Sequence, residues 1–114
     1  IKPSFAILGL TYKENTHSIK NSASIELLEK LKDYSVKVYD PGAHDDFNLH
    51  NVIRVSKMED TLNGADFLII MTPWQEFKSL SINEIKNRMN KLFNELRSYE
   101  KVQLMSCLRR LLNL

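Results

Sequence analysis

Two short runs of this chain are apolar at every position. Residues 5–10 read FAILGL and residues 67–71 read FLIIM. Unbroken hydrophobicity over so few residues is typical of strands that are covered on both faces, as in a parallel sheet. Residues 36–39 and 52–55 are rich in valine and predict two further strands, the second of them short. We therefore expect four strands along the first 71 residues.

A segment with helical spacing of apolar residues lies between the first two of these strands. Residues 25–31 place isoleucine and leucine on one stripe of a helix. Asn21, Ser22 and Ser24 are candidate N-caps, and Asn21 or Ser22 is favoured because each leaves a full first turn before the stripe. The order strand, helix, strand predicts a βαβ unit.

A second, shorter helix is expected before the fourth strand. Residues 58–63 predict it, with Ser56 as its cap, and Gly64 stands where a helix end needs a left-handed residue. Apolar positions at steps of three and four then predict a long amphipathic helix over residues 82–99. Residues 102–114 fit either a fifth strand or a further helix, and periodicity does not decide between them.

This alternation predicts an α/β fold. We expect a Rossmann-like open parallel sheet of about five strands in the order 3-2-1-4-5, with helices on both faces and a helical C-terminal segment. At 114 residues the chain has the size of one domain, so residues 1–114 are interpreted as a single domain.

Charge and cysteine content limit the classes of binding partner and the cellular compartment that we expect. Sixteen Lys and Arg against fourteen Asp and Glu give a net charge of +2, with no block of like charge that would indicate nucleic acid or a membrane surface. Cys107 is the only cysteine, which excludes an internal disulfide and favours a reducing compartment. No apolar run approaches the ~20 residues of a membrane span. The expected location is cytoplasmic.

The candidate site is the crevice between the first and fourth strands, where the expected strand order reverses. Residues 10–24 and 72–77 form its two loops. The first loop ends at a helix N-terminus, which attracts anions, and Lys13 or Lys20 adds a positive charge for a phosphate. Trp74 stands on the second loop. The competing interpretation of the first loop is a solvated polar connection. That of the second loop is the start of a helix, with Phe77 packed in the core.

Other kinds of site receive little support. The glycine spacings of a dinucleotide fingerprint or a Walker A loop are absent, so a complete NAD site is not expected. Residues 44–50 contain two histidines and two aspartates, but a surface loop is favoured over a metal site. Cys107 is interpreted as a buried small hydrophobe and Asp40 as a turn residue. We expect no metal site and no catalytic residue in this chain.

Several of these segments together resemble a known family. ILGLTYKENTHSIKNSASIELLEKL, then VKVYDP, then GADFLIIMTPWQEF are similar, in order over residues 7–77, to the C-terminal UDP-binding domain of the UDP-glucose/GDP-mannose dehydrogenase family. The resemblance implies that Tyr12 and Lys13 face the sugar and diphosphate, and that Trp74 lies at the substrate. Lys20 stands where the family more often has arginine, an exchange that loses bidentate geometry.

The resemblance also implies a larger parent enzyme. Members of this family oxidise the C6 alcohol of a nucleotide sugar to a carboxylate in two NAD-dependent steps, through an adduct on a cysteine that lies upstream of this module. Upstream domains bind NAD and form the dimer, so this chain alone is expected to bind a UDP-sugar and no NAD. Residues 92–97, LFNELR, are either a degraded form of the family's last strand or helix, and helix is favoured.

A second hypothesis is a scaffold that keeps the fold and has lost the ligand. Lys20, His17 and the divergent tail suggest it. The first hypothesis remains a UDP-sugar-binding domain of an NAD-dependent UDP-sugar 6-dehydrogenase.

Overall fold

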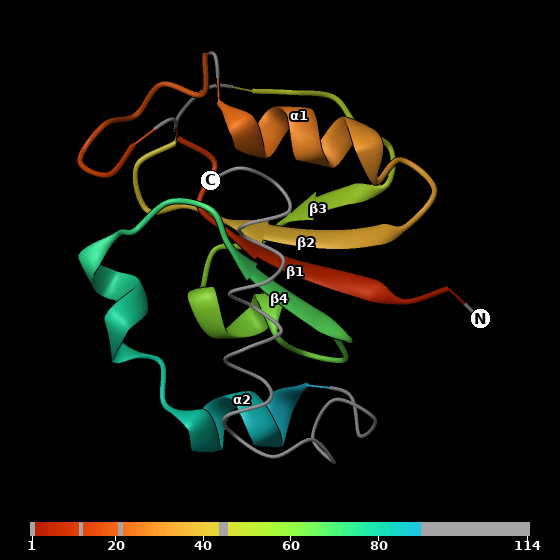
Figure 1. Ribbon diagram of the computed structural model, residues 1–114, viewed down its shortest axis with the longest axis vertical. Coiled ribbons are helices and arrows are strands. Elements are labelled where there is room, and N and C mark those ends of the chain that lie inside the picture. The colour runs from red at the N-terminus through yellow and green to blue at the C-terminus, as the bar shows by residue number, and fades with distance from the viewer. Residues whose placement is uncertain (1, 12, 21, 44–45, 90–114) are drawn as a thin grey trace.

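The computed structural model describes residues 2–11, 13–20, 22–43 and 46–89 (Figure 1). These residues form a four-stranded parallel sheet with the strand order β3-β2-β1-β4. In chain order the elements are β1 (Ser4–Leu8), α1 (Ala23–Lys30), β2 (Ser35–Tyr39), β3 (Val52–Arg54), the 3₁₀ helix η1 (Met58–Thr61), β4 (Phe67–Ile70), the 3₁₀ helix η2 (Gln75–Ser79) and α2 (Ile82–Arg88).

The predicted sheet and its order 3-2-1-4 are confirmed for the described strands. β1 is central and runs parallel to β2, with Leu8 opposite Tyr39, and to β4, with Leu8 opposite Ile70. The expected fifth strand falls in residues 90–114, which lie outside the described residues. Because the strands are parallel, β1, β2 and β4 all end at the same edge of the sheet, called the carboxyl edge below.

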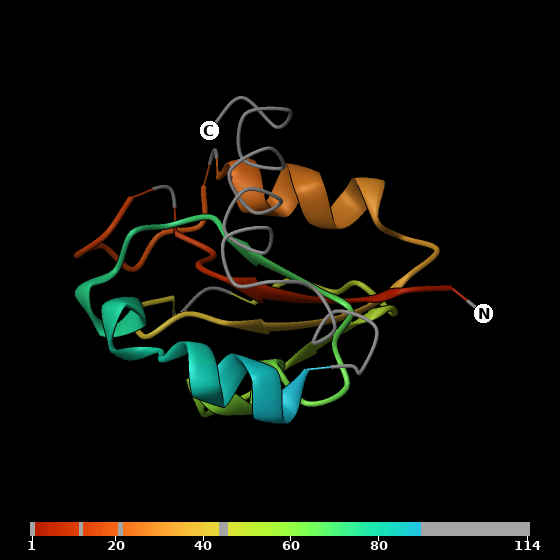
Figure 2. The same ribbon diagram turned by 60° about the horizontal axis from the view of Figure 1, so that its bottom comes forward.

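Each face of the sheet carries its own core, and helices cover both (Figure 2). α1 lies on one face, while η1 and α2 lie on the other. The α1 side buries Ile7, Leu10, Leu27, Leu28, Val36, Val38 and Ile69. The opposite side buries Ala6, Leu8, Met58, Leu62, Ala65, Leu68, Phe77, Ile85 and Met89. Alternate residues of β1 therefore supply both cores, which explains why its sequence is apolar at every position from Phe5 to Leu8.

α1 begins where the sequence predicts. Ser22 is the N-cap, and its hydroxyl accepts a hydrogen bond of 3.1 Å from the Ser24 N–H. The Ser24 hydroxyl in turn donates to the Gly9 carbonyl at 2.7 Å, and Ser24 is buried. This bond fixes the first turn of α1 against the end of β1.

Two helix predictions are corrected by the structure. The segment after β3 forms only the 3₁₀ helix η1, its N-cap is Lys57, and Ser56 makes no capping bond. The long helix expected over residues 82–99 ends at Arg88, because Met89 has an extended backbone with ψ 166°. The Arg88 carbonyl accepts from the Gly64 N–H at 2.9 Å, which ties the helix end to the turn before β4. Residues 90–99 lie outside the described part.

Gly9 and Gly64 both have positive φ, but their surroundings differ. Gly64 has φ 72°, as the sequence predicts, and a Cβ there would meet nothing within 4 Å. Gly9 has φ 105°, and a Cβ there would lie 2.5 Å from the Thr72 backbone nitrogen. The ends of β1 and β4 thus approach each other too closely for any side chain at position 9.

The two glycines provide a matched test of this close approach. We expect Gly64→Ala to lower the free energy of unfolding by about 1 kcal/mol, the cost of a left-handed alanine. Gly9→Ala adds a steric clash to backbone strain, and should cost about 3 kcal/mol or more. Urea unfolding of both variants measures the difference. Equal losses would contradict the close approach of the Gly9 and Thr72 backbones.

Candidate functional site

Three loops meet at the carboxyl edge of the sheet: residues 9–22 after β1, residues 40–43 after β2 and residues 71–74 after β4 (Figure 1). In open parallel sheets ligands bind at this edge, where neighbouring connections run to opposite faces. Here the connection after β1 leads to α1 on one face, and the connection after β4 leads through η2 to α2 on the other. The candidate site therefore lies at the ends of β1 and β4, as the sequence predicts.

The carboxylate of Asp40 joins these three loops. Its Oδ2 accepts hydrogen bonds from the backbone N–H groups of Leu10 and Thr11, at 2.7 and 3.0 Å. The same oxygen accepts from the Thr11 hydroxyl and from the indole N–H of Trp74, each at 3.1 Å. One oxygen atom thus links the end of β2 to the loop after β1 and to the loop after β4.

The other carboxylate oxygen of Asp40 shapes its own turn. Oδ1 accepts from the backbone N–H groups of Gly42 and Ala43, at 2.7 and 3.0 Å. The turn role that the sequence predicts for Asp40 is therefore confirmed, but it is half of what the carboxylate does. A Cβ at Gly42 would collide with the Thr16 carbonyl and lie 2.6 Å from the Trp74 ring, so this turn packs directly against both neighbouring loops.

Thr11 and Thr72 complete the junction. The buried Thr72 hydroxyl donates to the Thr11 carbonyl at 2.8 Å. The indole N–H of Trp74 also donates to the Thr11 hydroxyl at 3.3 Å, so the indole nitrogen, this hydroxyl and the Asp40 carboxylate are in mutual contact. Trp74 is half-buried, its indole N–H is directed into the protein, and its backbone N–H donates to the Thr72 carbonyl at 2.9 Å. Only its ring surface remains for contact with a ligand.

A second link joins β2 to the segment that follows Trp74. The Tyr39 hydroxyl donates to the Glu76 carboxylate at 2.7 Å, and the rings of Tyr39 and Phe77 lie 6.3 Å apart. Burial, followed by the hydrogen bond and the negative charge of Glu76, raises the pKa of Tyr39 from 10.0 to about 12. Phe77 is buried, as the sequence predicts. η2 is therefore attached to β2 by polar and apolar contacts.

The residues predicted to bind substrate are brought to the same edge, as far as they are described. Lys13 and Lys20 are exposed on the loop between β1 and α1, and Trp74 lies beside the base of that loop. The Lys13 carbonyl accepts from the Thr16 hydroxyl at 2.8 Å, and Asn15 has φ 62°, so a tight turn follows Lys13. Tyr12 lies outside the described residues.

The sequence offers one hint of the junction, for Asp40, and none for Thr11. An aspartate before Pro-Gly is a common turn pattern, and this local role is by itself a sufficient reason for an aspartate at position 40. Its other partners lie 29 to 34 residues away along the chain. The available hint was the position of Asp40 at the end of an expected strand, next to the candidate crevice.

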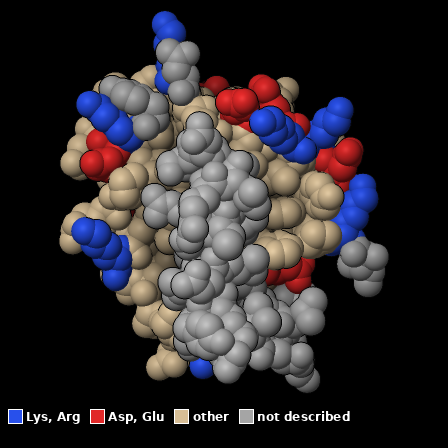
Figure 3. All heavy atoms as spheres, viewed as in Figure 1, with Lys and Arg blue, Asp and Glu red and all other residues tan. Residues whose placement is uncertain are grey.

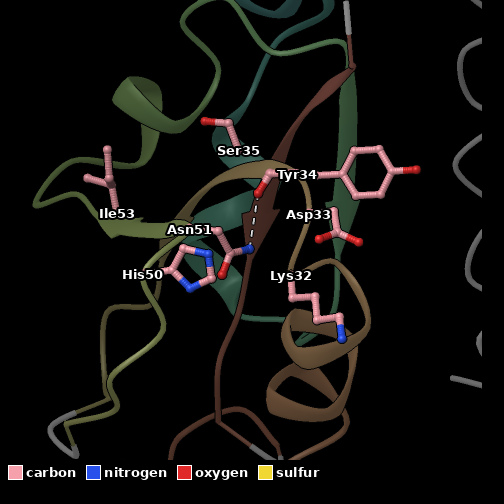
Figure 4. A pocket seen from close by; sticks show the side chains of 7 residues that line it. All are labelled: Lys32, Asp33, Tyr34, Ser35, His50, Asn51 and Ile53. Atoms are coloured by element: carbon pink, nitrogen blue, oxygen red, sulfur yellow. Dashed lines mark hydrogen bonds between the residues drawn. The ribbon is translucent and has the colours of Figure 1, made fainter.

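A hollow of about 480 Å³ lies at the opposite edge of the sheet (Figure 4). Asn51 lines it and donates from Nδ2 to the carbonyls of Leu31 and Tyr34, at 2.9 and 3.0 Å. These bonds hold the connection from α1 to β2 against β3. The residues that line the hollow are Lys32, Asp33, Tyr34, Ser35, His50, Asn51 and Ile53.

Other site classes have no geometric support within the described ranges. No group of three or more His, Cys, Asp or Glu side chains is placed to hold a metal ion there. His44 and Asp45 of the loop considered for metal, like Cys107, lie outside these ranges. No helix in this part is long and apolar enough to cross a membrane. Basic and acidic side chains lie among one another on the face seen in Figure 3.

Comparison with known proteins shows which sequences this chain is similar to. Residues 6–95 match the sequence pattern of the UDP-glucose/GDP-mannose dehydrogenase family, UDP binding domain. UDP-glucose 6-dehydrogenase of Rickettsia prowazekii is 36% identical over 88 residues, covering 72% of this chain and 20% of that protein. UDP-N-acetyl-D-mannosamine dehydrogenase of Methanococcus vannielii is 33% identical over 98 residues, covering 83% and 22%. The chain spans about a fifth of the length of these curated relatives.

Solved structures agree with the sequence matches. The UDP-D-ManNAc dehydrogenase of Pyrococcus horikoshii superposes with a TM-score of 0.63 at 28% identity, covering 78% of this chain and 20% of that one. A UDP-glucose dehydrogenase of Pyrobaculum islandicum gives a TM-score of 0.63 at 26% identity, covering 69% and 19%.

The raised pKa of Tyr39 predicts how stability depends on pH. Because its pKa is about 12 in the fold and 10.0 in the unfolded chain, the bond to Glu76 contributes fully below pH 10. Its contribution declines as the pH rises from 10 through 12. Tyr39→Phe should therefore be less stable than wild type by roughly 1 kcal/mol at pH 8, and this difference should shrink across that window. Urea unfolding at several pH values tests it, and a constant difference up to pH 12 would contradict the assignment.

Proposed function

The chain belongs to the UDP-glucose/GDP-mannose dehydrogenase family as a UDP-binding domain, and from that premise we propose that it binds the UDP part of a nucleotide sugar at the carboxyl edge of its sheet. The observation that carries the proposal is the junction of three loops at the ends of β1, β2 and β4. The hydrogen bonds of this junction hold the start of a loop that carries two lysines and leads to the N-terminus of α1.

The diphosphate is proposed to lie over the loop between β1 and α1. The backbone N–H groups of the first turn of α1 carry a partial positive charge, which favours an anion there. Lys13 and Lys20 stand on the same loop and are exposed, so their ammonium groups can approach phosphate oxygens. Ser24 holds this helix start against Gly9 at 2.7 Å, which keeps the turn in place before a ligand arrives.

Four residues are proposed to contact the UDP-sugar. Tyr12 and Lys13 are proposed to face the sugar and the diphosphate. Lys20 is proposed to bind the substrate from a position where relatives more often carry arginine. Trp74 is proposed to offer its ring surface, because its indole N–H is held by Asp40 and Thr11. Aromatic faces stack on nucleobases with little dependence on sequence.

The proposed parent is an NAD-dependent UDP-sugar 6-dehydrogenase that oxidises the C6 alcohol to a carboxylate. NAD does not fit the described residues: Gly9 is the only glycine between β1 and α1, and a long polar loop stands where a dinucleotide site needs a tight glycine turn. NAD is therefore assigned to other domains of the parent. The catalytic cysteine and the dimer contacts are assigned there as well.

Lys13 provides the direct test. We expect UDP at millimolar concentration to shift the amide resonances of residues 13–24 and the indole resonance of Trp74. Lys13→Ala should weaken UDP binding by about 1.5–3 kcal/mol, or roughly tenfold or more, because a charge-assisted contact is lost. Titration calorimetry or amide shifts give the affinity.

Lys30→Ala is the matched control. Lys30 is also exposed, but it stands at the end of α1 away from the carboxyl edge and pairs with Glu26 at 3.6 Å. Its removal should leave UDP affinity unchanged. Equal effects of the two substitutions would indicate general charge attraction, and the absence of any UDP response would favour a scaffold that has lost its ligand.

A further inference from the structure

We propose that Asp40 is a positioning residue for UDP binding: its carboxylate holds the loop after β1 and the Trp74 indole in their binding geometry and makes no contact with the nucleotide. This inference rests on the proposed function. It concerns a residue whose place in the sheet suggests the opposite role, because an acidic side chain after the second strand of dinucleotide-binding sheets hydrogen-bonds a ribose.

The hydrogen-bond capacity of Asp40 is already used within the protein. An ionised carboxylate offers about four lone-pair sites on its two oxygens. Here Oδ2 receives four donors and Oδ1 receives two, all at 2.7 to 3.1 Å. A ribose hydroxyl would have to displace one of these donors. A displaced backbone N–H at this partly buried place would then lack a partner, which costs about as much as the new bond gains.

The donors that Asp40 holds belong to the elements that carry the proposed contacts. Thr11 is held three times over, by its N–H, its hydroxyl and, through Thr72, its carbonyl. Lys13 follows two residues later, so the position of Thr11 sets where the Lys13 side chain starts. Trp74 is held through the indole nitrogen, and this fixes the orientation of its ring.

Loss of the carboxylate should therefore release both binding elements together. Asp40→Asn keeps the size of the side chain but replaces one oxygen with an NH₂ group. Whichever way the amide is turned, this group faces N–H donors, on the Oδ1 side those of Gly42 and Ala43 or on the Oδ2 side those of Thr11 and Trp74. With the NH₂ group on the Oδ1 side, the loop and the indole keep only a neutral amide oxygen as acceptor, which binds them less strongly than a carboxylate; with it on the Oδ2 side, they lose their acceptor. Either way their common anchor is weakened while the rest of the core is unchanged.

Asp66 supplies a matched control at the other end of the sheet. Its Oδ2 accepts from the backbone N–H of Ser4 at 2.8 Å, and the Ser4 hydroxyl lies 3.4 Å away. Like Asp40, Asp66 is a half-buried carboxylate that anchors the backbone at one end of β1. Asp66→Asn should lower stability without changing the carboxyl edge.

The experiment compares Asp40→Asn, Asp66→Asn and the unmodified 114-residue chain, using UDP and 2′-deoxy-UDP as probes. Amide spectra and urea unfolding first establish that each variant is folded at the temperature of the titration. We expect Asp40→Asn to weaken both probes by the same factor, about tenfold or more. It should also speed hydrogen exchange at the Thr11 amide and the Trp74 indole. Asp66→Asn should leave both affinities within about twofold.

Three results would overturn the proposal. The first is an Asp40→Asn variant that weakens UDP much more than 2′-deoxy-UDP, because this pattern indicates a direct ribose contact. The second is unchanged hydrogen exchange at Thr11 and Trp74 in that variant. The third is an equal loss of affinity in Asp66→Asn, which would make the effect one of general stability. If the unmodified chain binds neither probe, the proposed function fails, and the exchange rates alone decide whether Asp40 holds the loop.

Discussion

One carboxylate holds together the part of this domain that faces a ligand. Parallel strands deliver their ends to the same edge, but the ladder of strand hydrogen bonds reaches only the first residue of two of the loops beyond it, at Gly9 and Met71. Asp40 holds these loops with bonds to Leu10, Thr11 and Trp74 from one oxygen and to its own turn from the other. Hydrogen bonds to an ionised acceptor are about twice as strong as neutral ones, so a single side chain suffices to join three loops.

The small residues around this carboxylate are what allow the loops to meet. Gly9 lets the end of β1 pass against Thr72, and Gly42 lets the turn after β2 pass against Trp74. The two cores support the junction from below, because alternate side chains of β1 point into each of them. Polar loops thus rest on a well-packed base, an arrangement that limits how much a ligand must reorganise the protein when it binds.

The sequence predicts those features that are local. The apolar runs in β1 and β4, the Ser22 cap and the turn at Gly64 follow from neighbouring residues, and the structure confirms them. The end of α2 and the junction at Asp40 depend instead on residues that are far apart in the sequence. Apolar spacing continues past Met89, yet α2 ends where the Arg88 carbonyl bonds to Gly64. The junction at Asp40 is likewise hidden in the sequence, since a solvated turn would carry the same Asp-Pro-Gly pattern.

The central place of β1 also constrains the order in which this domain can be assembled. Leu10 meets Asp40 after 30 intervening steps along the chain, whereas Thr11 meets Thr72 only after 61. During synthesis β1, α1, β2 and β3 can come together first, which covers one face of the sheet and leaves Ala6 and Leu8 bare on the other. That face is covered only as η1, Phe77 and α2 follow, and β1 gains its second neighbouring strand only when β4 arrives. Until then the nascent chain presents an apolar surface and an unpaired strand edge, the two features that favour aggregation and attract chaperones.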